Sequence, residues 1–127
     1  MHALIVDDSE PMRKLLGMML QKLGFESVEA ASALEAQGHL ARSSIAVALV
    51  DWGLPGVNGI EFIKNIRGQA RYQDLKIIMT TALSEHEHKD HAYAAGANEY
   101  LMKPLTANAL RTKLESLGLL RGSAATA

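Results

Sequence analysis

Two patterns of apolar and polar residues alternate along the chain. Short apolar runs bounded by turn residues are typical of buried strands, and five such runs occur, at 3–6, 27–30, 45–51, 75–80 and 99–102. Between these runs, apolar residues recur at spacings of three and four, which is typical of helices with one buried face. Strands and helices that alternate through short connections predict a parallel sheet with helices on both faces.

Start and stop signals delimit the predicted helices. The first helix starts near Pro11, which suits a first turn, and stops at Gly24. Capping-box patterns at 32–35 and 84–87 open the second and fourth helices, and Thr106 is a candidate cap for the last one. We expect the first helix to bury an apolar stripe formed by Met12, Leu15, Leu16, Met19, Leu20 and Leu23.

Polar residues gather where the predicted strands end. The carboxyl ends of the strands in a doubly wound sheet face one crevice, and ligands bind there at the point where the strand order reverses. Taken alone, Asp51 fits a solvated acid at a strand end equally well, because Asp is common in turns. The joint arrival of acids, hydroxyls and an ammonium at one rim instead indicates a functional site made of Asp7, Asp8, Asp51, Thr80, Thr81 and Lys103.

Composition narrows the class of protein. The 127 residues suffice for one domain, which we place at residues 1–120, with a short flexible C-terminal tail at 121–127. The net charge of −1 gives no general attraction to nucleic acid. There is no cysteine, no signal peptide and no apolar segment near the roughly 20 residues of a membrane span. We therefore expect a cytoplasmic protein that does not insert into membranes.

Crowded carboxylates point to a cation and to phosphoryl chemistry. Like charges repel unless a cation neutralises them, and a set of oxygen ligands without histidine favours Mg²⁺. A carboxylate beside Mg²⁺ can attack phosphorus and form an aspartyl phosphate. Asp51 ends the central strand alone beside a loop, which makes it the best candidate nucleophile. Asp7 and Asp8 are better placed to hold the metal.

The segments around these residues carry a resemblance to a known family. They are VDDSEPMRK (6–14), LVDWGLPGVNGIEF (49–62), IIMTTA (77–82) and AAGANEYLMKPL (94–105), and with them the resemblance extends to about residue 117. The chain resembles the response-regulator receiver domains of two-component signalling, and among them it is most similar to stand-alone chemotaxis-type receivers. The resemblance implies a flavodoxin-like, doubly wound α/β fold whose five-stranded parallel sheet has the order 2-1-3-4-5.

The resemblance assigns metal and phosphoryl roles at the acidic rim. It makes Asp51 the phosphoacceptor and a Mg²⁺ ligand, and Asp8 a direct Mg²⁺ ligand. Asp7 would hold the ion mainly through water, and the carbonyl of Gly53 would complete the protein ligands.

Further roles follow from the fourth and fifth predicted strands. Thr81 matches the switch hydroxyl of the family because Ala82 follows it. Thr81, Ala82 and Lys103 would bind the phosphoryl group, and Tyr100 matches the aromatic residue that turns inward on activation. The resemblance also implies a cis peptide bond between Lys103 and Pro104.

Partners are implied as well. A histidine kinase would donate the phosphoryl group, and the phosphorylated monomer would bind a downstream protein through the fourth helix, fifth strand and fifth helix. Because no DNA-binding segment follows the last helix, we expect output through that surface. Both chemotaxis-type signalling and a phosphorelay shuttle to a histidine phosphotransferase fit the sequence.

Two other hypotheses fit less well. A phosphatase with an Asp nucleophile needs a second Asp two residues later as general acid, and Gly53 occupies that position here. A degenerate receiver that only mediates contacts is disfavoured by the complete set of site residues. We therefore expect no enzyme activity beyond autocatalysis of the protein's own phosphorylation and dephosphorylation.

Overall fold

The computed structural model describes residues 1–82 and 89–120. The strands are β1 (His2–Val6), β2 (Glu26–Ala30), β3 (Val47–Asp51), β4 (Lys76–Thr81) and β5 (Glu99–Met102). The helices are α1 (Glu10–Lys22), α2 (Ala33–Arg42), α3 (Gly59–Arg67), α4 (Lys89–Ala95) and α5 (Ala107–Ser116), and a short 3₁₀ helix, η1 (Ala70–Tyr72), follows α3. The capping-box pattern at 84–87 and the tail at 121–127 lie outside the described residues.

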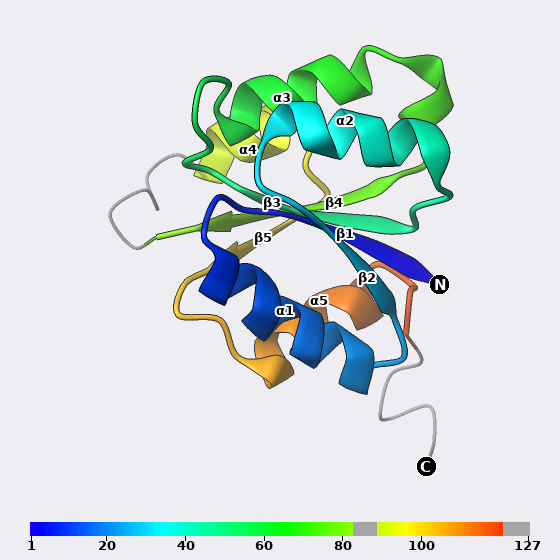
Figure 1. Cartoon of the computed structure of the whole chain (residues 1–127), viewed down its shortest axis with the longest axis vertical. Coiled ribbons are helices and arrows are strands. Elements are labelled where there is room, and N and C mark those ends of the chain that lie inside the picture. The colour runs from blue at the N-terminus through cyan, green and yellow to red at the C-terminus, as the bar shows by residue number, and fades with distance from the viewer. Residues whose placement is uncertain (83–88, 121–127) are drawn as a thin grey trace.

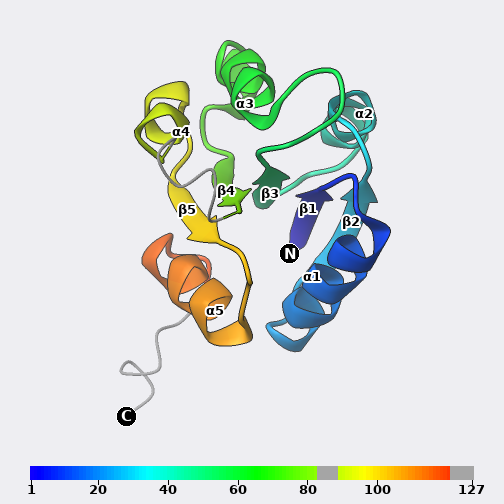
Figure 2. The ribbon, with the colours of Figure 1, turned by 90° about the vertical axis from the view of Figure 1, so that its left-hand side faces the viewer.

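All five strands are parallel and form one sheet in the order β2-β1-β3-β4-β5. Helices α1 and α5 cover one face of the sheet, and α2, α3 and α4 cover the other (Figures 1 and 2). The strand order reverses between β1 and β3, so their carboxyl ends flank the crevice in which doubly wound proteins bind ligands. The predicted fold class and strand order are confirmed.

The sheet separates two apolar clusters. Every residue of β3 is buried, which is expected of a central parallel strand covered by helices on both faces. The cluster beneath α2, α3 and α4 includes Phe62, Ile63 and Ile66. The cluster beneath α1 and α5 includes Leu16, Leu20, Leu110 and Leu114.

The prediction for α1 is wrong at Leu15, whose exposed fraction is 42%. Leu16 and Leu20, by contrast, are fully buried. Adjacent residues of a helix point about 100° apart, so a helix that directs Leu16 at the sheet turns Leu15 to the side. The apolar stripe is therefore narrower than its sequence spacing suggests.

Side-chain caps fix where the helices begin. The Ser9 hydroxyl accepts a hydrogen bond from the Met12 amide, and Ser32 and Thr106 cap α2 and α5 as predicted. Asn58 caps α3 by accepting from the Glu61 amide at 2.9 Å. Each cap satisfies a backbone donor that the first helical turn leaves free. The caps of α1 and α3 thereby set the paths of the loops that follow β1 and β3.

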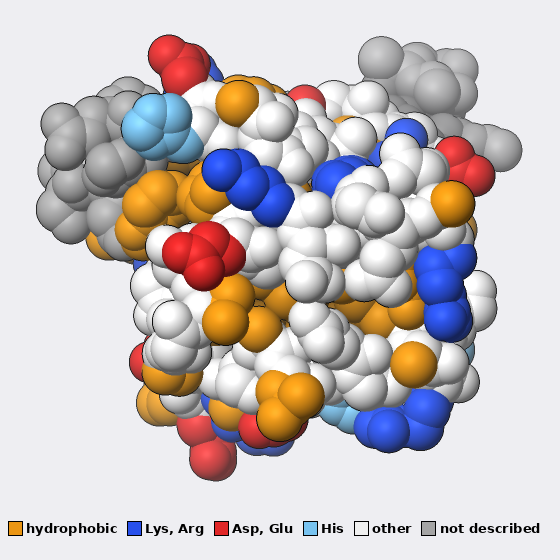
Figure 3. Space-filling model, turned by 90° about the horizontal axis from the view of Figure 1, so that it is seen from above, with side chains coloured by type: hydrophobic (Ala, Val, Ile, Leu, Met, Phe, Trp, Pro, Cys, Tyr) orange, Lys and Arg blue, Asp and Glu red, His pale blue; other side chains and the backbone are white. Residues whose placement is uncertain are grey.

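The outer face of α2, α3 and α4 is chemically mixed. Figure 3 shows hydrophobic side chains there between acidic and basic ones, and neither sign of charge dominates the view. Of the helices within residues 1–82 and 89–120, none is long and apolar enough to cross a membrane.

Arg67 ties together the end of the sheet opposite the strand carboxyl ends. Its guanidinium donates to the carbonyls of Gly96 at 2.9 Å and Tyr72 at 2.8 Å, and to Oδ1 of Asn98 at 2.7 Å. The Asn98 Oδ1 also accepts from the backbone of Ile77 at 2.8 Å. Burial lowers the pKa of Arg67, but the three acceptors compensate for the lost hydration. One side chain thus joins α3, η1, β4 and the turn that enters β5.

Replacing Gly96 with alanine tests this network. Gly96 has a φ of +119°, and a Cβ there would lie 2.5 Å from Cγ of Arg67, which cannot move without breaking its hydrogen bonds. We expect Gly96→Ala to lower the free energy of unfolding, measured in urea, by about 1–3 kcal/mol. The control is Gly24→Ala, because Gly24 has a φ of +92° and no atom within 4 Å of its Cβ position. An equal loss in both variants would show that the contact with Arg67 costs nothing.

Candidate functional site

Four strands deliver polar side chains to one crevice. Asp7 follows β1, Asp51 ends β3, Thr81 ends β4 and Lys103 follows β5. Ligand atoms of Asp7, Asp8 and Asp51 all lie within 4.8 Å of one another. Asp7 and Asp51 are buried, with exposed fractions of 1% and 7%, whereas Asp8 is exposed. The acidic rim predicted from the sequence is thus formed, with one acid facing solvent.

Lys103 supplies the positive charge inside this group. Its Nζ lies 2.8 Å from Oδ1 of Asp51 and 3.5 Å from Oδ2 of Asp7. Burial alone would lower the pKa of Lys103, but the hydrogen bond and charge of Asp51, with a smaller part from Asp7, raise it above its usual value. The ammonium therefore stays protonated across the physiological range. The Lys103–Pro104 peptide is cis, as the resemblance implies.

Asp7 is strongly constrained. Its Oδ1 accepts the Ser9 amide at 2.9 Å, and its own amide donates to the carbonyl of Ala30 at 3.0 Å. The pKa of Asp7 is raised, first by burial and then by the negative charge of Asp51, although the Ser9 amide and Lys103 act against the shift. The carboxylate of Asp7 is therefore less stable in the folded protein than it would be in water.

The loop after β3 is anchored at Trp52, the residue that follows Asp51. The Trp52 amide donates to the carbonyl of Thr80 at 3.0 Å, and the Gly59 amide donates to the carbonyl of Trp52 at 2.9 Å. A Cβ at position 59 would collide with the carbonyl oxygen of Asp51, so only glycine lets α3 begin this close to the strand. At position 53 a Cβ would lie 3.8 Å from Oδ2 of Asp51, which sets Gly53 directly beside the carboxylate.

The end of β4 contributes a buried hydroxyl group that has no hydrogen-bond partner among the described residues. Thr80 pairs with Asp51 in the sheet register, and Thr81 is the next residue. The Thr81 Oγ1 is buried and has no hydrogen-bond partner among the described residues. Unpaired buried hydroxyls are unfavourable, so this atom is available to a ligand that brings an acceptor. Ala82 follows it and is half-buried.

Tyr100 lies on the neighbouring strand. It pairs with Met79 in the register of β4 and β5 and is buried. The Nζ of Lys89, at the start of α4, lies 5.9 Å from the centroid of its ring. Tyr100 thus connects β5 with α4, next to the strand that ends at Thr81.

The residues present fit a hard divalent cation. Three carboxylates converge, one of them open to solvent, and oxygen donors without histidine or thiolate are the set that Mg²⁺ prefers. The pKa of Asp7 is raised first by burial and also by the charge of Asp51, and Lys103 offsets these effects only in part. A cation bound beside Asp7, Asp8 and Asp51 would supply the missing compensation.

Fold and site together define a doubly wound α/β protein with an acidic cluster and a lysine at its switch point. The chain matches the family model for the response regulator receiver domain over residues 3–115. It therefore belongs to the response regulator receiver family of two-component signalling.

Individual relatives agree with this assignment. The chemotaxis protein CheY homolog of Campylobacter jejuni is 38% identical over 119 residues, which are 92% of each chain. The chemotaxis protein CheY-3 of Vibrio cholerae is 37% identical over 118 residues, 92% of this chain and 91% of that protein. The solved structure of the Vibrio cholerae chemotaxis protein CheY4 has a TM-score of 0.84 at 32% identity and covers 91% of this chain and 97% of that one.

Two residues near the site were not found from the sequence. Asn58 could have been recognised, because an Asn directly before a helix with Glu three residues later is a cap signal. Arg13 donates from Nη1 to the carbonyl of Asp7 at 2.8 Å. Its position at the end of the first turn of α1 carries no local signal for this contact.

The raised pKa of Asp7 predicts how stability depends on pH. An acid whose pKa is raised by folding destabilises the protein once it ionises, and this penalty disappears below its unfolded pKa near 3.8. We expect Asp7→Asn to unfold at a higher urea concentration than the wild type at pH 7 in metal-free buffer. The difference should shrink as the pH falls toward 4, and Asp8→Asn, at an exposed position, should show little effect. A less stable Asp7→Asn at pH 7 would contradict the electrostatic account.

Proposed function

We propose that this protein is a phosphorylation-controlled signalling switch that accepts a phosphoryl group on Asp51 from a histidine kinase. The observation that carries the proposal is the Asp51 carboxylate, buried at the switch point with Lys103 at 2.8 Å and two more acids beside it. Residues 1–120 form the receiver unit. Because its relatives are named as chemotaxis proteins, we propose a pathway of the same type.

The chemistry assigns each side chain a task. An oxygen of Asp51 attacks the phosphorus of the phosphohistidine donor. The phosphorus–nitrogen bond breaks, and the departing imidazole of the kinase histidine keeps the electron pair. A Mg²⁺ ion held by Asp7, Asp8 and Asp51, with the carbonyl of Gly53, would neutralise negative charge on the transferring group. Lys103 balances the charge that develops on the phosphoryl oxygens.

The hydroxyl of Thr81 completes the site. A phosphoryl group on Asp51 brings acceptor oxygens to a place where the buried Oγ1 has no partner. We propose that Thr81 donates a hydrogen bond to one of these oxygens and that the Ala82 amide helps to bind the group. This gain is available only after phosphorylation, so it favours a shifted position of β4's end in the phosphorylated state.

Catalytic turnover on other substrates is not part of the proposal. A phosphatase of this chemistry needs a second Asp two residues after the nucleophile as general acid, and that position is Gly53 here. The protein would therefore catalyse only its own phosphorylation and dephosphorylation.

We propose that α4, β5 and α5 form the output surface for a downstream protein that binds the monomer. Tyr100 is buried on β5, where it pairs with Met79 of β4, and Nζ of Lys89 at the start of α4 lies 5.9 Å from the centroid of its ring. A movement of Thr81 toward the phosphoryl group would change the space beside Tyr100. The partner would then select the repacked surface.

Fluorescence of Trp52, the only tryptophan, tests the assignment of the nucleophile. Because Trp52 adjoins Asp51, Mg²⁺ should change its emission, and acetyl phosphate should cause a further change only when Mg²⁺ is present. Asp51→Asn should abolish the response to acetyl phosphate, and Asp8→Ala should lose most of the response to the metal. Lys103→Ala should still bind Mg²⁺, since its ammonium contacts carboxylates and not the ion.

The control is Asp74→Asn, an exposed acid far from the crevice, which should behave as the wild type. Uptake of phosphate by Asp51→Asn at the wild-type rate would refute the assignment.

The variant Thr81→Val tests whether the Thr81 hydroxyl serves the response to phosphorylation and not the stability of the fold. The isosteric change removes a buried hydroxyl without a partner, so the free energy of unfolding should stay equal or rise, by up to about 1–3 kcal/mol. Amide hydrogen exchange with beryllofluoride as phosphoryl mimic should change in α4, β5 and α5 of the wild type, and much less in Thr81→Val. Asp51→Asn serves as the control without a nucleophile. Changes confined to α1 and α2 would argue against the proposed surface.

A further inference from the structure

Arg13 bridges the end of β1 and the edge strand β2 beneath the acidic cluster. Its Nη1 donates to the carbonyl oxygen of Asp7 at 2.8 Å, and its Nε donates to Oε1 of Glu29 at 3.0 Å. Only 14% of the side chain is exposed. The planar guanidinium can hold both acceptors at once, so a residue of α1 is fixed against two strands.

The carbonyl that Arg13 holds belongs to the peptide that links Asp7 to Asp8. The amide of Asp7 is bound by Ala30, and its Oδ1 accepts the Ser9 amide. Rotation of the Asp7–Asp8 peptide would redirect the side chain of Asp8, which is exposed. Arg13 is the contact that blocks this rotation from the carbonyl side.

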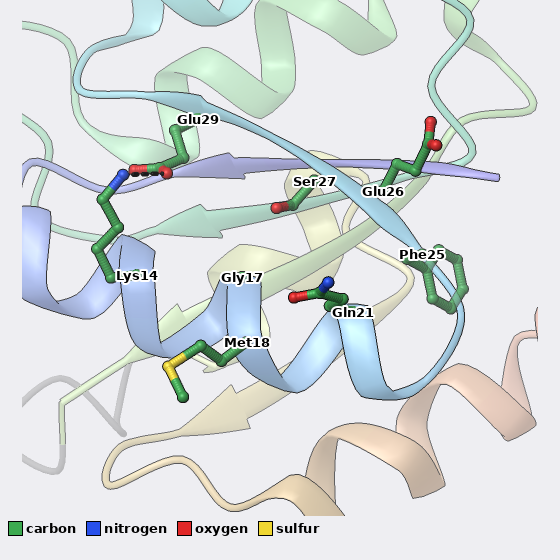
Figure 4. A pocket seen from close by; sticks show the side chains of 8 residues that line it. All are labelled: Lys14, Gly17, Met18, Gln21, Phe25, Glu26, Ser27 and Glu29. Carbon is green, nitrogen blue, oxygen red and sulfur yellow. Dashed lines mark hydrogen bonds and ion pairs between the residues drawn. The ribbon is translucent and has the colours of Figure 1, made fainter.

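Glu29 in turn orients Arg13. Its Oε2 accepts from Nζ of Lys14 at 2.8 Å while its Oε1 accepts from Arg13 (Figure 4 shows the pair with Lys14). The pKa of Glu29 is lowered, first by the hydrogen bond from Lys14 and also by Arg13, so Glu29 remains charged at neutral pH. Lys14 thus shares the anchor of Arg13, but no described hydrogen bond or ion pair joins it to the acidic cluster.

We propose that Arg13 is a positioning residue for the metal site. Through the Asp7 carbonyl it fixes the peptide that carries Asp8, so that the acids stand in their binding arrangement before a cation arrives. This inference rests on the proposed function, because it requires Asp7 and Asp8 to hold Mg²⁺. Partners behind metal ligands typically change metal affinity by about 10- to 100-fold when they are removed.

The experiment compares Arg13→Gln and Arg13→Lys with the control Lys14→Gln in Mg²⁺ titrations followed by Trp52 fluorescence. Arg13→Gln should raise the dissociation constant of Mg²⁺ about tenfold. Arg13→Lys keeps the charge but cannot hold both acceptors, so it should also bind Mg²⁺ more weakly than the wild type. Lys14→Gln removes the other cation at Glu29 and should stay within about twofold of the wild type, because Lys14 does not hold the Asp7 carbonyl.

Two further measurements distinguish a specific loss of metal binding in Arg13→Gln from a general loss of structure. At saturating Mg²⁺, phosphorylation of Arg13→Gln by acetyl phosphate should recover to within about threefold of the wild type, since weaker metal binding is its defect. In metal-free buffer, the amide resonances of Asp8 and Ser9 should shift in both Arg13 variants and not in Lys14→Gln. If Arg13→Gln does not fold, Glu29→Gln keeps the test open, because it weakens the anchor of Arg13 and should raise the dissociation constant by about threefold.

The outcomes separate the two levels of the proposal. If the wild type responds to Mg²⁺ and the Arg13 variants bind it as tightly as Lys14→Gln does, the positioning role is overturned while the proposed function stands. If the wild type itself shows no response to Mg²⁺, the proposed function fails and the inference fails with it.

Discussion

Burying Asp7 beside Asp51 is unfavourable unless a cation lies within a few ångströms of both. Desolvation and mutual repulsion disfavour the two charges together, and the raised pKa of Asp7 reflects this cost. The chain answers it with Lys103, which comes 52 residues after Asp51 and reaches its Oδ1 at 2.8 Å. Three carboxylates, those of Asp7, Asp8 and Asp51, face the one ammonium of Lys103, so the site retains an excess of negative charge. That excess is the reason a second cation fits there.

The doubly wound fold meets this constraint by bringing the acids and Lys103 to one end of the sheet. Parallel strands with right-handed crossovers bring all their carboxyl ends to one end of the sheet, and the reversal of strand order opens a crevice between β1 and β3. The two ends of the sheet differ in how completely their polar groups are hydrogen-bonded. At the end opposite the crevice, Arg67 finds an acceptor for each part of its guanidinium. At the crevice, the buried hydroxyl of Thr81 finds none among the described residues.

The sequence predicts those features that local patterns encode. The apolar run of β3 ends on Asp51 because both faces of the strand are buried and its last residue reaches the crevice. The caps at Ser32 and Thr106 are local, because each side chain accepts a hydrogen bond from the backbone amide three residues later. Spacing alone predicts a buried Leu15, because it does not say which side of the apolar stripe faces the sheet.

Contacts between distant segments could not be predicted. Arg13 reaches Glu29 across 16 residues, and Arg67 reaches Asn98 across 31. Both arginines look like ordinary charged residues of helices when only their neighbours in sequence are known. In the sequence, only the resemblance distinguishes Thr81 from Thr80. Both are buried residues of β4, and the buried hydroxyl without a described partner is that of Thr81. A residue that bonds to a backbone carbonyl leaves no pattern in either sequence segment.

The difference in hydrogen bonding between the two ends of the sheet has a consequence for switching. A site in which every donor and acceptor is already paired must break bonds to take up a new charged group, and the broken bonds offset the new ones. Here one donor that a phosphoryl group on Asp51 would need, the buried hydroxyl of Thr81, has no partner among the described residues, and the ammonium of Lys103 already lies at Asp51. Donors arranged in advance need little reorganisation when charge appears. A hydrogen bond from Thr81 to the phosphoryl group would then be a gain confined to the phosphorylated state, and such a differential gain is what shifts a two-state equilibrium.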